Sequence, residues 1–186
     1  NLTSENFVGI SSGGADLEII GATSEFDDVS NEFLSSVYDP DNNRVILSYA
    51  DSGNSTYGTA VVGAISGNSI TFGTPVVFQA AACDSGGITY DTTNNRVVIT
   101  YKNVGNSGYG TAVVGTATSS SISFGTPVVF QSSSTSRTTP CFDSNAGKVA
   151  IFYGGPSSSI RSRVGTVNSS NNSISYGTEV VVDAGS

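Results

Sequence analysis

Basic and aromatic residues at repeated positions are the first feature of this sequence that could do chemistry. They follow a spacing of 52 residues, and they are Arg44, Tyr49, Tyr57, Arg96, Tyr101, Tyr109, Lys148 and Tyr153. Cationic and aromatic side chains together suit the binding of glycans or anions, so one interpretation is an equivalent ligand site in each repeat. The alternative is that the bases pair with nearby aspartates and the tyrosines pack between sheets.

A run of acids and amides just before the first base suggests a second chemistry. The stretch "DPDNN" offers Asp39, Asp41 and Asn43 at alternate positions, as at the start of a calcium-binding loop. The glycine and the late glutamate of such a loop are missing, and the equivalent stretches "DTTNN" and "DSNAG" carry fewer acids. The sequence favours a hairpin turn in which side-chain oxygens accept hydrogen bonds from backbone amides, with calcium as the weaker hypothesis.

Paired carboxylates are a third candidate, because glycoside hydrolysis requires two of them in one cleft. Acids are densest near the N-terminus, at Asp16, Glu18, Glu25, Asp27, Asp28 and Glu32. A solvated face is the simpler interpretation of that cluster. Glu179 and Asp51 stand at unrepeated positions and remain as candidates for a polysaccharide hydrolase or lyase.

Histidine is absent, which excludes a Ser-His-Asp or Cys-His catalytic site and any histidine-based metal site. Two cysteines cannot build a zinc cluster. Cys83 and Cys141 occupy different places in the repeat, and they are either two buried small residues or a disulfide. We expect no cofactor.

The charge of the chain limits its partners. The net charge is −8 and the pI is near 4.1, whereas binding of nucleic acid or of an anionic membrane requires clustered bases. No apolar run approaches the roughly 20 residues of a membrane-spanning helix. The sequence begins at Asn1 without a methionine or a signal peptide, which suggests a processed product or a fragment.

Tandem repetition organises all these residues. The phrases "YGTAVVG" and "FGTPVVFQ" each occur twice, 52 positions apart. One unit reads as four strands, "GITYD", "VVITY", "YGTAVVGTA" and "ISFGTPVVF", joined by turns rich in Gly, Asn and Ser. The sequence predicts an all-β fold of tandem four-stranded antiparallel repeats, arranged as β-propeller-like blades or, alternatively, as a linear stacked fibre.

The predicted boundaries leave an incomplete unit at the N-terminus. Residues 1–33 match only the third and fourth strands of a unit, and complete units follow at 34–81, 82–133 and 134–186. Pro75 and Pro127 lie inside the fourth strand, which indicates an outer edge of each sheet. The missing strands would come from neighbouring repeats of a longer chain or, by self-association, from another copy.

The phrases "DTTNNRVVITYK" and "YGTAVVGTATSSSISFGTPVVF" resemble the tandem repeats of about 50 residues in marine bacteriophage tail-fibre proteins and in surface proteins of marine bacteria. "NLTSENFVGISSG" resembles a segment that accompanies them, while "SSSIRSRVGTV" departs from their pattern. The resemblance implies a virion or extracellular surface location and no catalytic residues. We therefore expect a non-catalytic structural and adhesive module that attaches to surface glycans or a host receptor. The alternatives are a self-assembling fibre subunit and, less favoured, the polysaccharide-cleaving enzyme.

Overall fold

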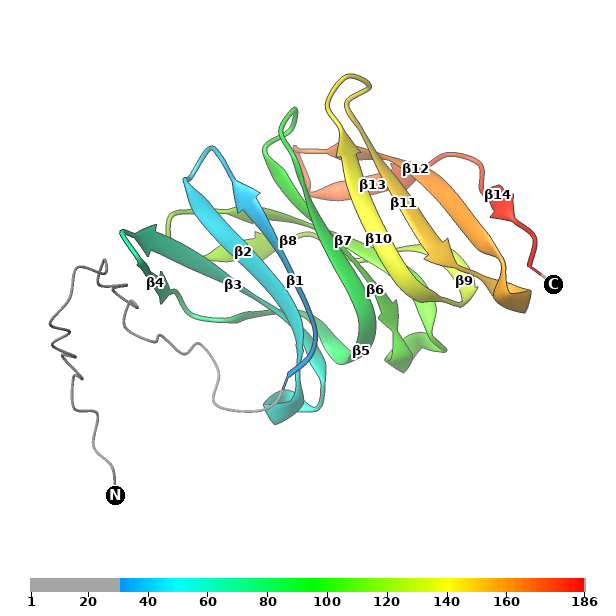
Figure 1. Cartoon of the computed structure of the whole chain (residues 1–186), viewed down its shortest axis with the longest axis horizontal. Coiled ribbons are helices and arrows are strands. Elements are labelled where there is room, and N and C mark those ends of the chain that lie inside the picture. Colours follow the sequence, from blue (N-terminus) through cyan, green and yellow to red (C-terminus); the bar gives the residue numbers. More distant parts are fainter. Residues whose placement is uncertain (1–30, 186) are drawn as a thin grey trace, which may run out of the picture.

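Strands account for nearly all of the regular structure in the described part of the chain. A computed structural model describes residues 31–185, and the predicted half-unit in residues 1–33 lies almost wholly outside them. Hydrogen bonds join the strands into a nine-stranded sheet and a five-stranded sheet, both antiparallel. In Figure 1 the strands follow one another from blue and cyan, through green, to yellow and red. The prediction of an all-β, antiparallel fold is confirmed.

Unit 1 contains β1 (Asn31–Asp39), β2 (Arg44–Asp51), β3 (Tyr57–Ser66) and β4 (Ser69–Phe72). The first half of β5 (Val76–Asp91) pairs with β3 and completes the unit, and its second half pairs with β6 and begins the next. Because one continuous strand pairs with strands of both units, units 1 and 2 share β5.

Unit 2 continues from the second half of β5 with β6 (Arg96–Asn103), β7 (Tyr109–Ala117), β8 (Ile122–Phe124) and β9 (Val128–Ser134). Unit 3 contains β10 (Ser136–Asp143), β11 (Lys148–Gly154), β12 (Ile160–Asn168), β13 (Ser173–Tyr176) and β14 (Val180–Asp183). Short 3-10 turns join the second and third strands of each unit, at Ser52–Asn54, Val104–Asn106 and Pro156–Ser158.

The outer strand of each unit is broken in the middle, which the sequence did not predict. In unit 1 the break falls at Gly73–Pro75, so that β4 and β5 pair separately with β3. The amide of Gly73 donates to the carbonyl of Val62, and Gly125 and Gly177 make the equivalent bonds. The prolines lie in these breaks rather than within a paired strand, since proline has no amide to donate.

The hydrophobic core lies between the units. One cluster joins Ile46, Val62 and Phe78 of unit 1 to the side chains of unit 2, including Ile99 and Tyr101. A second cluster joins units 2 and 3 in the same way. We call the side of a unit that packs on the preceding unit its leading face, and the side that packs on the following unit its trailing face. Apolar residues occur on both sides of the central strands because both faces are covered.

Candidate functional site

The first turn of each unit is fixed by its aspartate, as the hairpin-turn interpretation predicted. Asp39 Oδ1 accepts hydrogen bonds from the backbone amides of Asp41 and Asn42, at 2.9 and 3.1 Å, while Oδ2 accepts one from the Asn42 side chain. Asp91 and Asp143 cap the equivalent turns.

The weaker calcium hypothesis is not supported by this geometry. Asp41 accepts a hydrogen bond from Tyr90, and the Asn43 side chain accepts one from Tyr38. All three predicted ligands, Asp39 included, therefore already accept hydrogen bonds from other groups of the protein. Among residues 31–185, no group of three or more Asp, Glu, Cys or His side chains is arranged to hold a metal ion.

The repeated tyrosines on the second strands are buried, so a ligand cannot reach them. Tyr49, Tyr101 and Tyr153 are among the largest side chains with essentially no exposed surface. The hydroxyl of Tyr101 donates to Gln79 of the preceding unit at 2.9 Å. The prediction of a ligand-binding role for these three residues is wrong, and the alternative of packing between sheets is correct.

The repeated arginines join neighbouring units. Arg44 Nε donates to the carbonyl of Ser119 in unit 2 at 2.7 Å, and Arg96 Nη2 donates to the carbonyl of Ser169 in unit 3 at 2.7 Å. Lys148 donates to Thr166 of its own unit instead. The expectation that these bases pair with turn aspartates is wrong: Arg44 and Arg96 reach across to the turn between the third and fourth strands of the following unit, and Lys148 bonds within its own unit.

Tyr57 and Tyr109 lie at the other end of the sheets. Each begins a third strand and pairs with the residue that ends the second strand, Asp51 or Asn103. Both are half-buried. They are thus separated by the length of a strand from the aspartate turns and do not join the arginines in one site.

An open groove runs across the aspartate turns of all three units. Its volume is about 510 Å³, and its lining residues come from matching positions. These residues are Val37, Tyr38, Pro40, Thr89, Tyr90, Thr92, Phe142 and Ser144. Tyr38, Tyr90 and Phe142 are the aromatics that directly precede the turn aspartates, so the repeat places one aromatic ring from each unit along the groove.

Polar groups at the groove have defined orientations. The Tyr90 hydroxyl donates to Asp41 Oδ2 at 2.6 Å, and the half-exposed Tyr38 donates to Asn43 Oδ1 at 3.0 Å. Burial, followed by the hydrogen bonds to and charges of Asp41 and Asp39, raises the pKa of Tyr90 above its ordinary value. Tyr90 is therefore a neutral hydroxyl held beside a carboxylate. These aromatics repeat every 52 residues in the sequence, although nothing in the sequence alone assigns them to a site.

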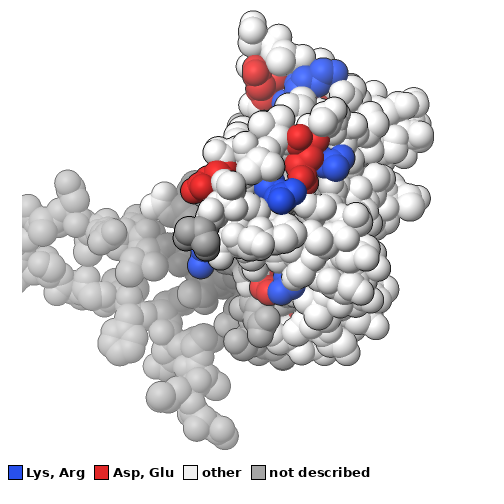
Figure 2. All heavy atoms as spheres, turned by 90° about the vertical axis from the view of Figure 1, so that its right-hand side faces the viewer, with Lys and Arg blue, Asp and Glu red and all other residues white. Residues whose placement is uncertain are grey.

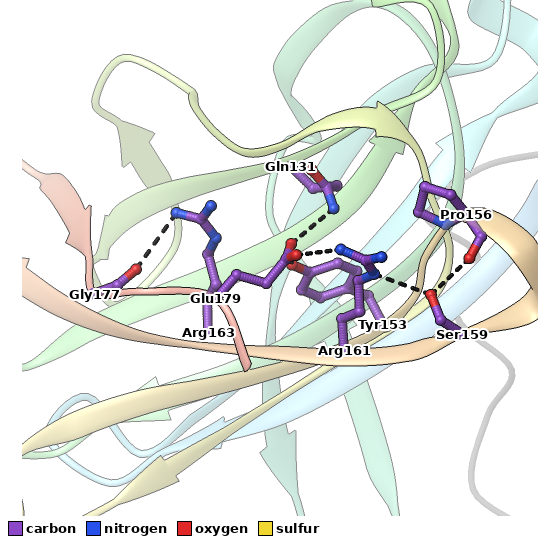
Figure 3. Close-up of polar contacts among 8 residues, drawn as sticks. All are labelled: Gln131, Tyr153, Pro156, Ser159, Arg161, Arg163, Gly177 and Glu179. Carbon is purple, nitrogen blue, oxygen red and sulfur yellow. Dashed lines mark hydrogen bonds and ion pairs between the residues drawn. The ribbon is translucent and has the colours of Figure 1, made fainter. Parts of the chain in front are cut away.

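A second polar cluster is centred on Glu179 of unit 3 and includes Gln131 of unit 2 (Figure 3). Glu179 occupies the position that Pro75 and Pro127 hold in the other units. Its Oε2 accepts hydrogen bonds from Tyr153 at 2.6 Å and Gln131 at 2.8 Å, and its Oε1 pairs with Arg161. Both of its oxygens are thus engaged.

Electrostatics stabilise this cluster. Desolvation alone would raise the pKa of Glu179, but hydrogen bonds from Tyr153 and Arg161 and the charges of Arg161 and Arg163 lower it below its ordinary value. Burial and the neighbouring carboxylate raise the pKa of Tyr153 to about 12. Glu179 is held as a carboxylate and Tyr153 as a neutral donor. Asp51, the other acid considered for hydrolysis, caps the turn at Asn54 in unit 1, so the two acids do not converge.

The two cysteines lie in different sheets and both are free thiols, so the disulfide hypothesis is wrong. Cys83 is buried in β5, and Cys141 is exposed on β10. The alternative of two buried residues therefore holds for Cys83 only. Burial raises the pKa of the Cys83 thiol to about 12. Within residues 31–185, no helix is long and apolar enough to cross a membrane.

Comparison with solved structures finds a similar fold. The sequence matches no protein-family model, and no curated protein is similar to it in sequence. A crystal structure of a protein of unknown function from Dyadobacter fermentans DSM 18053 has a similar fold, with a TM-score of 0.54 and 15% sequence identity. The similarity covers 78% of this chain and 40% of that protein, so it extends over two or more of the units described here.

Proposed function

We propose that this chain is a non-catalytic, adhesive repeat module of a virion appendage or other extracellular surface structure, and that it binds surface glycans along the groove over the aspartate turns. In this proposal the units are propeller-like blades. The observation that carries it is the lining of the groove by matching residues of three successive units, with an aromatic ring from each.

The chemistry of the groove suits an extended sugar polymer. Aromatic faces pack on the apolar faces of sugar rings, and Tyr, Thr and Ser hydroxyls exchange hydrogen bonds with sugar hydroxyls. A polymer with repeating sugars can meet an aromatic ring at each unit, while the residues beside the ring differ between units. The carboxylate of Asp41, which already accepts from Tyr90, adds a fixed acceptor that favours neutral over acidic sugars.

The two acids considered for hydrolysis, Glu179 and Asp51, are not arranged for catalysis, which favours a binding role. Glu179 and Asp51 belong to different units, and each is committed to hydrogen bonds within the protein. A cleaving enzyme requires one protonated and one ionised acid in a single cleft, which these residues do not provide.

Binding to an array of bacterial and algal surface polysaccharides, followed by calorimetry on the best ligand, tests the proposal. We expect Tyr38→Ala to weaken binding by at least about tenfold, because it removes the most exposed ring of the groove. Tyr57→Ala is the matched control, since Tyr57 is a half-buried tyrosine at the opposite end of the same sheet. The wild-type protein should release no reducing ends from the bound glycan.

Two results would contradict the proposal. One is a wild-type protein that binds no glycan on the array. The other is equal loss of affinity in the Tyr38 and Tyr57 variants, which would place the binding outside the groove.

A further inference from the structure

Unit 3 has a pocket at the end of its sheet opposite the aspartate turns. Its volume is about 340 Å³, which is near the lower end of the roughly 300–1,000 Å³ of small-molecule sites. Figure 2 looks onto this end of the molecule and shows a surface with few charged side chains. Among the residues that line the pocket are Ser136, Arg137, Phe152, Gly154, Gly155 and Ile160.

The pocket exists because unit 3 lacks two side chains that unit 2 has at the same positions. In unit 2, Asp84 and Lys102 form an ion pair with a distance of 3.5 Å between the charged atoms. Ser136 and Gly154 take these two positions 52 residues further on. Gly155 likewise replaces the asparagine that caps the 3-10 turn of unit 2, and the turn of unit 3 has no side-chain cap. Space that unit 2 fills with longer side chains is therefore open in unit 3.

Arg137 supplies a positive charge at this pocket. It lies in the bulge of β10 with a left-handed backbone, at the position that Phe33 and Ser85 hold in the other units. The bulge recurs in every unit and belongs to the fold, whereas the arginine occurs in unit 3 alone. Within residues 31–185, no hydrogen bond or ion pair engages its exposed guanidinium. Its N–H donors are therefore available to a ligand.

The two acids at the C-terminal end of unit 3 do not neutralise Arg137. Glu179 forms its ion pair with Arg161. The carboxylate of Asp183 accepts a hydrogen bond from the backbone amide of Gly185 at 3.1 Å. A negatively charged ligand in the pocket would thus meet a cation that no carboxylate of the described chain has paired.

Apolar surface and hydroxyl groups complete the lining of the pocket. Phe152 is 41% exposed and Ile160 is 47% exposed, and both can pack on the apolar face of a sugar ring. Ser136 and Ser158 can exchange hydrogen bonds with sugar hydroxyls. A guanidinium such as that of Arg137 donates two parallel hydrogen bonds to a carboxylate or a sulfate. These groups together match a sugar ring that carries an acidic group, because a bare inorganic anion would leave the apolar surface uncovered.

We propose that this pocket binds one acidic sugar residue, either a uronic acid or a sulfated sugar, with the anionic group on Arg137 and the ring against Phe152. The pocket shares no residue with the groove over the aspartate turns, so the inference does not rest on glycan binding there. The groove suits neutral sugars and the pocket suits acidic ones. The two sites together would let the chain bind a polysaccharide of mixed composition.

Titration of isotopically labelled protein with glucuronate, glucose 6-sulfate and glucose, followed by two-dimensional NMR, tests the proposal. Glucose is the matched neutral ligand. We expect an acidic sugar to shift the amide signals of Gly154 and Gly155 and to bind at least about tenfold more tightly than glucose, because it gains charged hydrogen bonds. Its affinity should fall as the salt concentration rises. The acidic sugar that binds more tightly identifies which acidic group the pocket takes.

Two variants remove the charge and the space separately. Arg137→Gln should weaken binding of the acidic sugar by at least about tenfold and leave that of glucose unchanged. Ser136→Asp combined with Gly154→Lys restores the ion pair of unit 2 without changing the net charge, and it should abolish binding because it fills the pocket. Unit 2 carries these side chains at the same positions, so folding should survive, as circular dichroism will show. Lys148→Ala removes a charge at the opposite end of the sheet and is the control, which should bind as the wild type does.

Three results would overturn the proposal. The first is a wild-type protein that binds acidic sugars no more tightly than glucose. The second is binding of acidic sugars that survives in both the Arg137 variant and the double variant, which would place the site elsewhere. The third is loss of this binding in Tyr38→Ala, which would assign it to the groove. Because Tyr38→Ala should leave the pocket intact, either proposal can fail without the other.

Discussion

Arg96 of unit 2 donates from Nη2 to the backbone carbonyl of Ser169 in unit 3, 73 residues further along the chain. The same guanidinium donates from Nε to Oδ1 of Asn172 at 2.7 Å and from Nη1 to the carbonyl of Asn95. One planar side chain thus ties the first turn of its own unit to a turn of the next. Arg44 makes the corresponding bond between units 1 and 2.

Replacement of Arg96 by alanine should lower the free energy of unfolding by about 1.5–3 kcal/mol, because it leaves the acceptors of the unit 3 turn without their charged donor. Lys148→Ala is the control, since within residues 31–185 the Lys148 side chain bonds only to an exposed threonine of its own unit, and the substitution should change the stability by less than about 0.5 kcal/mol. Urea unfolding of the two variants measures both values. Equal destabilisation would mean that the contact between units contributes nothing.

The glycines of the broken outer strands give a second comparison. Gly125→Ala should destabilise the protein by about 2 kcal/mol or more, because the new methyl group overlaps backbone atoms of Asn172 that cannot rotate away. Gly177→Ala has space and should be nearly neutral. Thermal unfolding of the two variants is the measurement, and similar midpoints would show that the turn of unit 3 does not sit against Gly125.

The Glu179 cluster should make stability depend on pH. Glu179→Gln should cost about 1–3 kcal/mol at pH 7, since Arg161 and Tyr153 lose their ionised partner. Because the folded-state pKa of Glu179 is lowered, its contribution is complete above the unfolded-state pKa and is lost as the pH falls through the folded-state pKa. The difference between wild type and variant should therefore shrink on acidification. Urea unfolding at neutral and acidic pH measures it, and a constant difference would argue against the ion pair.

Thiol labelling checks the state of the cysteines. One thiol, the exposed Cys141, should react quickly in the native protein, and the buried Cys83 with its raised pKa should react only after unfolding. Cys141→Ser should abolish the fast reaction and leave the slow one. A native protein in which neither thiol reacts, before or after unfolding without a reductant, would instead indicate a disulfide.

The strands and their burial could be predicted from the sequence because each unit repeats the same pattern. Val97, Ile99 and Tyr101 alternate toward one side while Val98 is apolar on the other, and the structure buries both sides. The break in the outer strand was missed, although Gly73 and Pro75 mark it, since a proline at a sheet edge fits either a continuous or an interrupted strand.

The contacts between units could not be predicted from the sequence. Arg44 and Arg96 reach partners more than 70 residues away, and no local spacing identifies which turn a long side chain will meet. The groove had a visible signal, because Tyr38, Tyr90 and Phe142 repeat at a constant spacing. The Glu179 cluster also had a signal in the sequence, because an acid replaces a repeated proline. The sequence does not show that Arg161 and Gln131 lie beside this acid, since only the fold brings them together.

The continuous strand β5 determines how the molecule resists force. Pulling unit 1 away from unit 2 would have to strip β5 from β3 or from β6, so one of the two sets of backbone bonds must fail along that strand. The join between units 2 and 3 is held in a similar way, because the amide of Thr135 donates to the carbonyl of Gly108 as the amide of Cys83 donates to that of Thr56. Under tension the chain would therefore carry load through backbone hydrogen bonds at both joins.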